Sequence, residues 1–309
     1  MIQILFAAKA SDWGEYKHVL PEAIAAAGIQ AEVVTKADPS TVDYIVYAPN
    51  SAVQDFRPFT KLKAVLSLWA GVEKIVGNET LRVPLTRMVA TGLTEGMVEW
   101  CLGHTLRYHL GMDQDVCRTD AEWEIHVPPL ARDRRVTVLG MGALGRAVAL
   151  ALKGLGFDVA GWSRTPKAVD GITCFDGDAR LRDALARSEI LILLLPLTAA
   201  TENLLNAKRL GEMPKGAFVI NPGRGPLIDD DALLDALDTG QIAHATLDVF
   251  RVEPLPKDHP FWAHPCMTVT PHIAADTRAA SAAKVVAENI RRSEAGEPLL
   301  NLVNREAGY

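Results

Sequence analysis

Three side chains suited to acid–base and anion chemistry follow hydrophobic runs in the C-terminal half of the chain. They are Arg224 in VINPGRGPL, Glu253 in LDVFRVEPLP and His272 in VTPHIAADTR. An arginine stays charged and can hold an anionic group bidentately, and a histidine exchanges protons near neutral pH. A carboxylate beside the histidine would favour the imidazolium and fix its orientation. This combination suits binding an acid and moving a proton.

Each of the three also has a plain structural interpretation. Arg224 fits a surface cation in a Gly-rich loop, Glu253 a turn residue before Pro254, and His272 a strand-end imidazole. Their position at the ends of successive predicted strands, where open α/β sheets bind ligands, favours the catalytic interpretation. The remaining histidines show no metal-binding spacing such as H-E-x-x-H, and no metal site is predicted.

A glycine motif stands upstream of these residues. The run VTVLG leads into Gly140, Met141, Gly142, Ala143, Leu144 and Gly145, and then into the helical stretch RAVALALKGLG. Gly140 would permit a tight turn, Gly142 the close approach of a pyrophosphate, and Gly145 close packing of helix on strand. Alone this spacing also fits a structural turn, but the strand before it and the helix after it predict a dinucleotide site.

The residues after the next predicted strand bear on the type of dinucleotide. NAD sites carry an acidic residue about twenty positions beyond the glycines, whereas this chain reads Ser163, Arg164, Thr165, Pro166 and Lys167. Arg164, helped by its neighbours, could accept a 2′-phosphate through charge-assisted hydrogen bonds. NADPH is therefore favoured over NADH, although simple solvation of Arg164 and Lys167 is a serious alternative.

A nicotinamide cofactor beside these three residues fits the reduction of a small 2-keto acid. Arg224 would hold the carboxylate and polarise the carbonyl group. His272 would protonate the carbonyl oxygen as hydride arrives.

The elements that must position these residues follow an α/β pattern in both halves of the chain. The first hundred residues alternate short β-rich runs with helical or polar connections, and a long helix begins near Thr94. After Arg135 the strands are VTVLG, FDVAGW, ILILLLP, AFVINP, AHATLDVF and CMTVTPH. A tail helix is expected within 276–295. The pattern predicts two doubly wound parallel-sheet domains.

Between these halves, residues 115–135 are polar and contain proline, with Trp123 and Ile125 isolated among charged residues. The segment reads as an extended arm. An arm that wraps a second subunit and a plain surface loop are equally good interpretations.

Composition bounds the class of protein. The 309 residues are 49% hydrophobic and 23% charged, with a formal charge of −6, which describes a globular chain with two cores and no electrostatic footprint for nucleic acid. The longest apolar run, Ile190 to Pro196, is far shorter than the roughly twenty residues that span a bilayer. The N-terminus is unlike a secretory signal, so a cytoplasmic protein is expected.

The cysteines form no C-x-x-C pair and are expected in the core: Cys101, Cys117, Cys174 and Cys266.

The ordered blocks VTVLGMGALGR, GWSRTPK, LLLPLTAATENLLN, INPGRGPLIDDDALLDALDTGQI, LDVFRVEPLP and TPHIAADTR resemble the D-2-hydroxyacid dehydrogenase family, most closely its glyoxylate/hydroxypyruvate reductase A branch. The resemblance covers nearly the whole chain. It implies that Arg224, Glu253 and His272 are catalytic, and that small substrates such as glyoxylate and hydroxypyruvate are reduced to glycolate and D-glycerate.

The resemblance also implies the remaining site residues. A loop with Trp69, Ala70, Gly71 and Val72 would offer backbone amides to the substrate carboxylate. Leu195, Pro196, Thr198, Pro222 and Gly223 would line the cofactor, with Ala143 and Leu144, and Asp248 would meet the nicotinamide carboxamide. Pro222 stands where many relatives have a small residue, and Ala274 with Ala275 follows His272 where many have glycines, which does not decide the substrate preference. Trp69 is bulky for its loop and would either narrow the pocket or pack beneath it.

In domain terms, the resemblance implies a Rossmann cofactor domain at 99–275 inserted into a flavodoxin-like substrate domain made of 1–98 and 276–309. Family members are commonly homodimers that associate through their cofactor domains.

Rival classes fit the chain less well. A dinucleotide-sensing corepressor of the same family would carry extended partner-binding regions, and a β-hydroxyacid dehydrogenase would begin with the glycine motif and use a catalytic lysine. Formate and phosphoglycerate dehydrogenases of the superfamily are disfavoured by Ser163 with Arg164 and by the poorer motif match.

Overall fold

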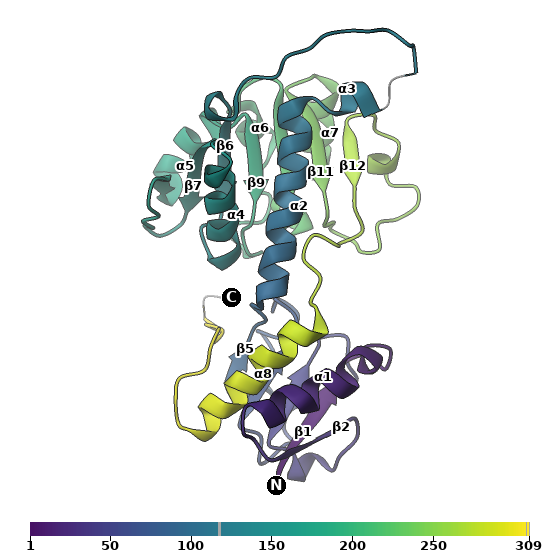
Figure 1. Cartoon of the computed structure of the whole chain (residues 1–309), viewed down its shortest axis with the longest axis vertical. Coiled ribbons are helices and arrows are strands. Elements are labelled where there is room, and N and C mark those ends of the chain that lie inside the picture. Colours follow the sequence, from purple (N-terminus) through teal and green to yellow (C-terminus); the bar gives the residue numbers. More distant parts are fainter. Residues whose placement is uncertain (117–118, 307, 309) are drawn as a thin grey trace. The chain divides into compact units, whose positions relative to one another are not determined.

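The computed structural model describes residues 1–116, 119–306 and 308 (Figure 1). The chain forms two compact units, one of Met1–Leu93 with Thr277–Tyr309 and the other of Thr94–Asp276. The helix α2 (Thr91–Leu110) begins in the first unit and continues in the second. Each unit is therefore built around its own sheet, and the first unit draws on both ends of the chain.

The first unit contains a five-stranded parallel sheet in the order β2-β1-β3-β4-β5. Its strands are β1 (Ile2–Ala7), β2 (Ala31–Val34), β3 (Tyr44–Tyr47), β4 (Ala64–Ser67) and β5 (Leu85–Thr86), and its helices are α1 (Trp13–Ala26), α8 (Ala279–Glu294) and the 3-10 turn η1 (Pro39–Thr41). This is the flavodoxin-like strand order.

Helix α1 shows why these residues form this element. Tyr16, Leu20 and Ile24 recur every four residues and are buried, which places them on one face of a helix. The helix packs against α8, the purple and yellow ribbons that lie side by side in Figure 1. The tail helix expected within 276–295 is thus present, and it completes the unit formed by the N-terminal strands.

The second unit contains a seven-stranded parallel sheet in the order β12-β11-β10-β9-β6-β7-β8. Its strands are β6 (Arg135–Leu139), β7 (Asp158–Ser163), β8 (Thr173–Asp176), β9 (Ile190–Leu193), β10 (Ala217–Asn221), β11 (Ile242–Leu247) and β12 (Met267–Val269). Its helices after α2 are α3 (Asp113–Val116), α4 (Ala143–Gly154), α5 (Gly177–Ala186), α6 (Ala207–Gly211) and α7 (Asp230–Asp238), with 3-10 turns η2 (Ala131–Asp133), η3 (Gly225–Leu227) and η4 (Pro260–Trp262).

The strands of this sheet are hydrophobic on both faces, and alternate residues enter different cores. In β9, Ile190 and Ile192 join a cluster with α2 and α4, whereas Leu191 and Leu193 join a cluster with α5, α6 and α7. Side chains of a strand alternate between faces, so helices cover both sides of the sheet. Figure 1 shows α2 and α4 on the near face and α5, α6 and α7 beyond it.

The strand order reverses between β6 and β9, because the chain runs from β6 outward to β8 and then returns to the other side of β6. Such a reversal creates a crevice at the carboxyl ends of the two strands, where doubly wound folds bind ligands. The predicted fold class, two doubly wound parallel-sheet domains, is confirmed.

Several local predictions need adjustment. The long helix starts at Thr91, three residues before the expected Thr94, and it ends at Leu110, after which the short α3 follows. Strand β8 was not predicted, because TCFD is short and only Phe175 in it is buried. Residues 121–130 have no regular structure. Of the cysteines expected in the core, Cys101 is buried, Cys174 and Cys266 are partly buried, and Cys117 lies outside the described residues.

In the part of the chain that the structure describes, no helix combines the length and apolarity needed to cross a membrane. Among the same residues, no cluster of histidine, cysteine and carboxylate side chains could hold a metal ion.

Candidate active site

The residues predicted to carry chemistry in the second unit lie along the carboxyl edge of its sheet. His272 follows β12, Asp248 and Glu253 follow β11, and Arg224 follows β10. The segment with Leu195, Pro196 and Thr198 follows β9, and the glycine motif follows β6. The run from Ser163 to Lys167 begins with the last residue of β7. Since all the strands are parallel, these segments emerge at one edge in the order of the strands.

The glycine motif forms a turn that other residues could not form. Gly140 has a φ of +106°, and a Cβ there would lie 2.4 Å from the Leu194 carbonyl oxygen. A Cβ on Gly145 would lie 1.7 Å from the Gly140 carbonyl oxygen. Gly142, the residue before α4, has open space where its Cβ would be. The turn therefore brings the first amides of α4 to the crevice and leaves room above them, which suits an anionic ligand.

The residues at the end of β7 remain accessible. Ser163 is buried and its hydroxyl donates to the Thr165 carbonyl oxygen at 2.7 Å, which closes a small turn. Arg164, Thr165 and Lys167 are exposed in that turn. Basic side chains thus lie one strand away from the glycine turn, and the sequence of the turn contains no carboxylate.

The segment after β9 is shaped by a residue that the motif did not single out. Thr201 accepts a hydrogen bond from the Thr198 N–H at 2.8 Å and donates to the Pro196 carbonyl oxygen at 2.7 Å. Leu195 is buried, whereas Pro196 and Thr198 are partly exposed. The sequence signal for this turn is a threonine three residues after another, a spacing typical of local side-chain hydrogen bonds.

Arg224 is positioned by Asn221, another residue that the sequence patterns did not single out. The fully buried Asn221 accepts from the Gly223 N–H at 3.0 Å and donates to the Arg224 carbonyl oxygen at 2.9 Å. Pro222 and Gly223 are buried between these contacts, and a Cβ on Gly223 would lie 2.8 Å from the Leu193 carbonyl oxygen. An asparagine before Pro-Gly is a usual turn signal that could have indicated this role.

His272 and Glu253 are brought together. The Nδ1 atom of His272 lies 2.8 Å from Oε2 of Glu253, and Oε1 of Glu253 accepts the Phe250 N–H at 2.9 Å. The hydrogen bond to Glu253 raises the pKa of His272 above its usual value, with burial acting against it and the Glu253 and Asp248 charges adding to it. Burial by itself would raise the pKa of Glu253, but hydrogen bonds from His272 and Phe250 lower it.

This pair leaves one ring nitrogen of His272 for chemistry. The side chain of His272 is 54% exposed, and Nδ1 is engaged by the carboxylate. Nε2 is the ring nitrogen that the carboxylate does not engage. Arg224 is close enough for its charge to lower the pKa of both partners, so the three side chains form one electrostatic group.

Asp248 determines the backbone around His272. It is buried, and its Oδ1 accepts the Thr270 hydroxyl at 2.5 Å and the Ile273 N–H at 2.9 Å, while its Oδ2 accepts the Ala274 N–H at 2.8 Å. His272 has a φ of +56°, a conformation that non-glycine residues keep only where neighbours hold it. The expected contact of Asp248 with a nicotinamide carboxamide stays a prediction.

The expected carboxylate-binding loop belongs to the first unit. It follows β4, where the Trp69 N–H donates to the Ser67 hydroxyl at 3.1 Å and the Met88 N–H donates to the Trp69 carbonyl oxygen at 3.0 Å. Ala70 and Gly71 are partly exposed, whereas the Val72 side chain is buried in the core of this unit. Val72 can therefore offer only its backbone to a ligand.

Comparisons with known proteins identify the family of the chain. Residues 102–274 match the family model described as D-isomer specific 2-hydroxyacid dehydrogenase, NAD binding domain. The glyoxylate/hydroxypyruvate reductase A of Serratia proteamaculans is 41% identical over 257 residues, which are 81% of this chain and 82% of that protein. The protein of the same name from Yersinia enterocolitica is 38% identical over 283 residues, 89% of this chain and 90% of the other.

Solved structures match over the whole chain. A D-isomer specific 2-hydroxyacid dehydrogenase from Xanthobacter autotrophicus Py2, in complex with NADPH and MES, has a TM-score of 0.92 and 40% identity, with 100% of this chain and 99% of that chain covered. An NADPH-dependent glyoxylate/hydroxypyruvate reductase from Sinorhizobium meliloti, in complex with NADP and sulfate, has a TM-score of 0.88 and 32% identity and covers 100% of both chains.

Proposed function

The chain belongs to the D-isomer specific 2-hydroxyacid dehydrogenase family, and from that premise we propose that it reduces glyoxylate and hydroxypyruvate to glycolate and D-glycerate, with NADPH as hydride donor. The observation that carries the proposal is the His272 to Glu253 contact of 2.8 Å beside Arg224, on the sheet edge that also holds the glycine turn. The names of the similar reductases support the substrate class.

The residues present fit a phosphorylated dinucleotide. The glycine turn offers the first amides of α4 and open space at Gly142, which suits a pyrophosphate. Arg164 and Lys167 stand exposed after β7 with no carboxylate in the sequence of their turn, which suits a 2′-phosphate. When bound, NADPH supplies the hydride. The proposed remaining contacts are Leu195, Pro196, Thr198, Pro222, Gly223 and Asp248.

The catalytic residues then divide the work. Arg224 binds the substrate carboxylate and polarises the carbonyl oxygen. His272, held charged by Glu253, gives its Nε2 proton to that oxygen and becomes neutral. Glu253 holds the ring in the orientation that aims Nε2 at the substrate, and it stabilises the imidazolium before transfer.

The two compact units take separate roles in the proposal. Thr94–Asp276 is the cofactor domain, and Met1–Leu93 with Thr277–Tyr309 is the substrate domain, with the Trp69–Val72 backbone binding the carboxylate. The boundaries at 98/99 and 275/276 stay predictions. A cytoplasmic location is part of the proposal, because NADPH is a metabolite of the cell interior.

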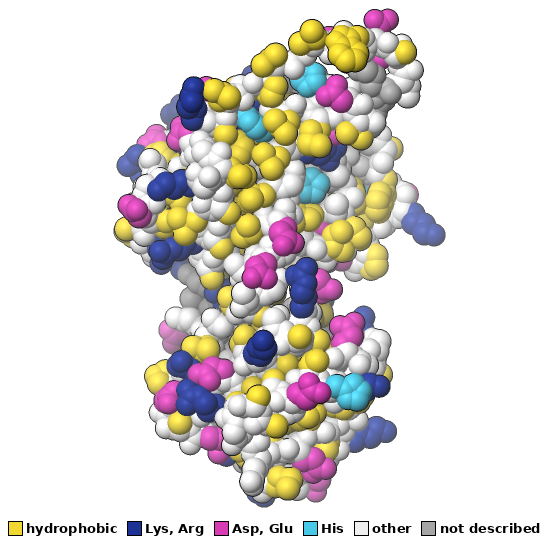
Figure 2. Space-filling view, viewed as in Figure 1, with side chains coloured by type: hydrophobic (Ala, Val, Ile, Leu, Met, Phe, Trp, Pro, Cys, Tyr) yellow, Lys and Arg dark blue, Asp and Glu magenta, His cyan; other side chains and the backbone are white. Residues whose placement is uncertain are grey.

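We propose that the chain forms a homodimer through its cofactor domains. Exposed apolar side chains gather on the arm and on the helices next to it, and Trp123 is 91% exposed. Figure 2 shows hydrophobic atoms on the arm and along the face that α2 and α4 form. Exposed apolar side chains gathered in this way favour association with another protein surface. The members are Leu110, Met112, Val116, Trp123, Ile125, Val127, Leu130, Leu150 and Leu155.

The deciding experiment follows nicotinamide absorbance with glyoxylate, hydroxypyruvate and pyruvate, each with NADPH and NADH. Rapid NADPH oxidation with glyoxylate and hydroxypyruvate is the expected result. Faster turnover with NADH would overturn the assignment of NADPH as cofactor but would leave the proposed roles of the catalytic residues unchanged. Cofactor binding without turnover on any acid would favour a sensing protein instead.

A further inference from the structure

The segment Phe250–Pro256, which follows β11, carries Glu253 where it is partly exposed. The alignment of Glu253 with His272 depends on how this segment is held. Its own contacts include the Phe250 N–H to Glu253 and packing of Phe250 against Phe261, with ring centroids 6.4 Å apart. These hold its first residue, and at its other end the Pro256 carbonyl oxygen accepts from Trp262 Nε1–H at 2.9 Å. Glu253 lies between these two ends.

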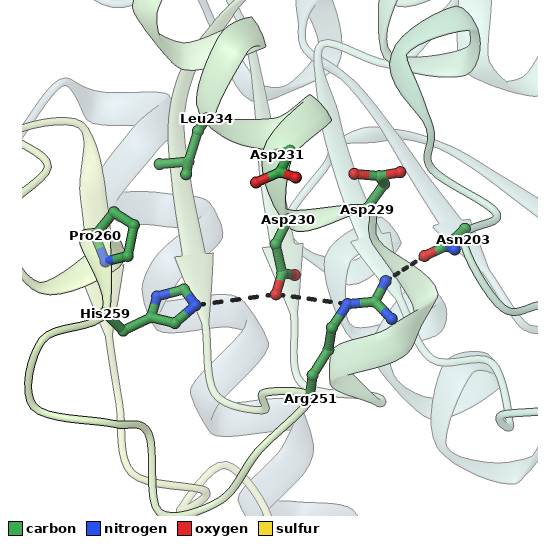
Figure 3. Close-up of a pocket in the computed structure, with 8 residues that line it drawn as sticks. All are labelled: Asn203, Asp229, Asp230, Asp231, Leu234, Arg251, His259 and Pro260. Carbon is green, nitrogen blue, oxygen red and sulfur yellow. Dashed lines mark hydrogen bonds and ion pairs between the residues drawn. The ribbon is translucent and has the colours of Figure 1, made fainter.

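Arg251 holds the middle of the segment through contacts with other parts of the second unit. Its Nη2 donates to the Ile228 carbonyl oxygen at 2.5 Å and to the Asn203 side-chain oxygen. Its Nε lies 3.5 Å from Oδ2 of Asp230. Figure 3 shows the guanidinium between Asn203 and Asp230. One side chain thus joins the Glu253 segment to the segment after β9 and to the link between β10 and α7.

Asp230 is itself held from the other side. Its Oδ2 lies 4.0 Å from Nε2 of His259, as Figure 3 shows. Burial raises the pKa of Asp230, while the charges of Arg251 and His259 act against that rise. His259 accepts the Phe261 N–H at Nδ1, and Phe261 packs on Phe250. The contacts therefore return to the start of the Glu253 segment.

The segment that Arg251 binds also carries Arg224. Between Arg224 and Ile228 the chain makes the 3-10 turn η3 (Gly225–Leu227). A Cβ on Gly225 would lie 2.1 Å from the Phe250 carbonyl carbon, so the two backbones touch directly. The Arg224 and Glu253 segments are therefore joined twice, by backbone contact at Gly225 and by the guanidinium at Ile228.

We propose that Arg251 is a positioning residue, which holds the Glu253 and Arg224 segments in the alignment that catalysis requires, with Asp230 holding the guanidinium in place. This inference rests on the proposed function. Arg251 lines a cavity of about 410 Å³ whose lining contains none of Arg224, Glu253 and His272, so it acts through them. The lining residues are Asn203, Asp229, Asp230, Asp231, Leu234, Arg251, His259 and Pro260.

The geometry requires an arginine. A guanidinium can donate to a backbone carbonyl and to a side-chain amide while it also faces a carboxylate, whereas an ammonium group is a point charge on a flexible stem. The ion pair to Asp230, whose two side chains are only 32% and 24% exposed, holds the guanidinium in place. The contacts to neutral oxygens of Ile228 and Asn203 are those that connect the two catalytic segments.

The test compares Arg251→Leu and Arg251→Lys with Arg209→Leu in the full chain. Arg209 is a matched control, because it is also partly exposed and donates to a backbone carbonyl, that of Leu204 at 3.0 Å, without contacting the Glu253 segment. We expect kcat with glyoxylate to fall between about tenfold and about a hundredfold in Arg251→Leu, with NADPH affinity unchanged. Arg209→Leu should keep the unmodified kcat.

The pH profile separates positioning from general destabilisation. Glu253 and Asp248 raise the pKa of His272 and Arg224 lowers it, and the hydrogen bond from Glu253 is the largest influence. Displacing Glu253 should therefore lower the pH at which reduction fails on the alkaline side. Arg251→Lys should show the same change with smaller size, and it serves as the deciding variant if Arg251→Leu does not fold.

A folded Arg251 variant with the unmodified kcat and the unmodified alkaline midpoint would overturn the inference while the reductase assignment stands. The same loss and shift in Arg209→Leu would overturn it too, since any local destabilisation would then suffice. Failure of the proposed function is recognised separately, as no keto-acid turnover by the unmodified chain, and would overturn both.

Discussion

At the scale of single residues, the site depends on how three side chains divide their hydrogen-bonding groups. Glu253 uses one oxygen on the Phe250 N–H and the other on His272, so the imidazole ring is held at one nitrogen and open at the other. Asp248 holds the backbone on both sides of the same ring. This geometry supports the proposal that Nε2 of His272 is the atom that transfers the proton.

His272→Ala should lower kcat by roughly 10²–10⁴-fold, the usual contribution of a general acid, because it removes the proton donor. NADPH binding should persist, since the glycine turn lies several strands away across the sheet. Steady-state kinetics and a cofactor titration by fluorescence measure the two quantities. Undiminished turnover would remove His272 from the mechanism.

Glu253→Gln should move the alkaline limit of the reaction to lower pH. In the proposed mechanism reduction requires charged His272, so activity should be lost as pH rises through its pKa, which the Glu253 hydrogen bond raises above the usual value. Glutamine keeps the shape but lacks the charge, and the raised pKa should fall back. A pH profile of kcat/KM checks this, and an unmoved midpoint contradicts it.

Arg164→Ala should weaken NADPH and leave NADH nearly unaffected. A charge-assisted hydrogen bond to a phosphate is worth about 1.5–3 kcal/mol, so the KM for NADPH should rise by roughly ten- to a hundredfold. Arg182→Ala, an exposed arginine on α5, is the control. Equal changes for both cofactors would count against a 2′-phosphate contact.

At the scale of elements, glycines allow backbones to approach where ligands must fit. Gly145 brings α4 onto the Gly140 carbonyl group, and Gly225 brings the Arg224 and Glu253 segments into contact. The helices on either face hold the strands in register, and parallel pairing places every site segment of the second unit at one edge. The position of each candidate site residue in the second unit is therefore set mainly by strand order.

Gly145→Ala should destabilise the second unit and weaken NADPH binding. Its Cβ would lie 1.7 Å from a backbone oxygen, so α4 must shift, and overpacking of this kind costs typically about 1–3 kcal/mol. Gly154→Ala, in the same helix with open space around it, should instead be neutral or slightly stabilising. Urea unfolding of both variants makes the comparison, and equal stabilities would refute the packing argument.

At the scale of the whole molecule, the first unit is built from two separate segments of the chain, whereas the second unit is built from one continuous segment. The C-terminal segment returns to the first sheet, where the Val303 N–H donates to the Leu85 carbonyl oxygen and Arg305 donates to the Val76, Asn78 and Leu81 carbonyl oxygens. The second unit carries the arm. Most of its exposed apolar side chains cluster on the arm and its neighbouring helices.

Trp123→Asp should shift the protein from dimer towards monomer. A charge on a buried apolar interface lacks a partner and is costly to desolvate, whereas Trp123→Phe keeps an apolar ring and should keep the dimer. Sedimentation velocity at several concentrations measures the mass. A monomeric unmodified protein would contradict the dimer proposal, and an unshifted Trp123→Asp would exclude the arm from the interface.

Periodicity and motif spacing are local properties of the chain, so the sequence alone indicates the elements and the edge that carries the site. Apolar runs of four to six residues predicted most strands, the glycine motif predicted the β6 to α4 turn, and residues at strand ends predicted the edge where the site lies. Strand β8 was missed because TCFD buries too little for a pattern. The roles of the individual site residues stay predictions until variants are measured.

The tertiary structure alone decided which distant groups meet. Nothing local to LDVFRVEPLP indicates that Arg251 reaches Ile228 and Asn203, or that Asp248 binds the Ile273 and Ala274 amides. These contacts join segments that follow different strands, and only the sheet order and the approach of backbones at glycines set their separation. The sequence by itself thus determines which residue types occur and the order of the helices and strands along the chain. Packing between these elements decides which groups each side chain contacts.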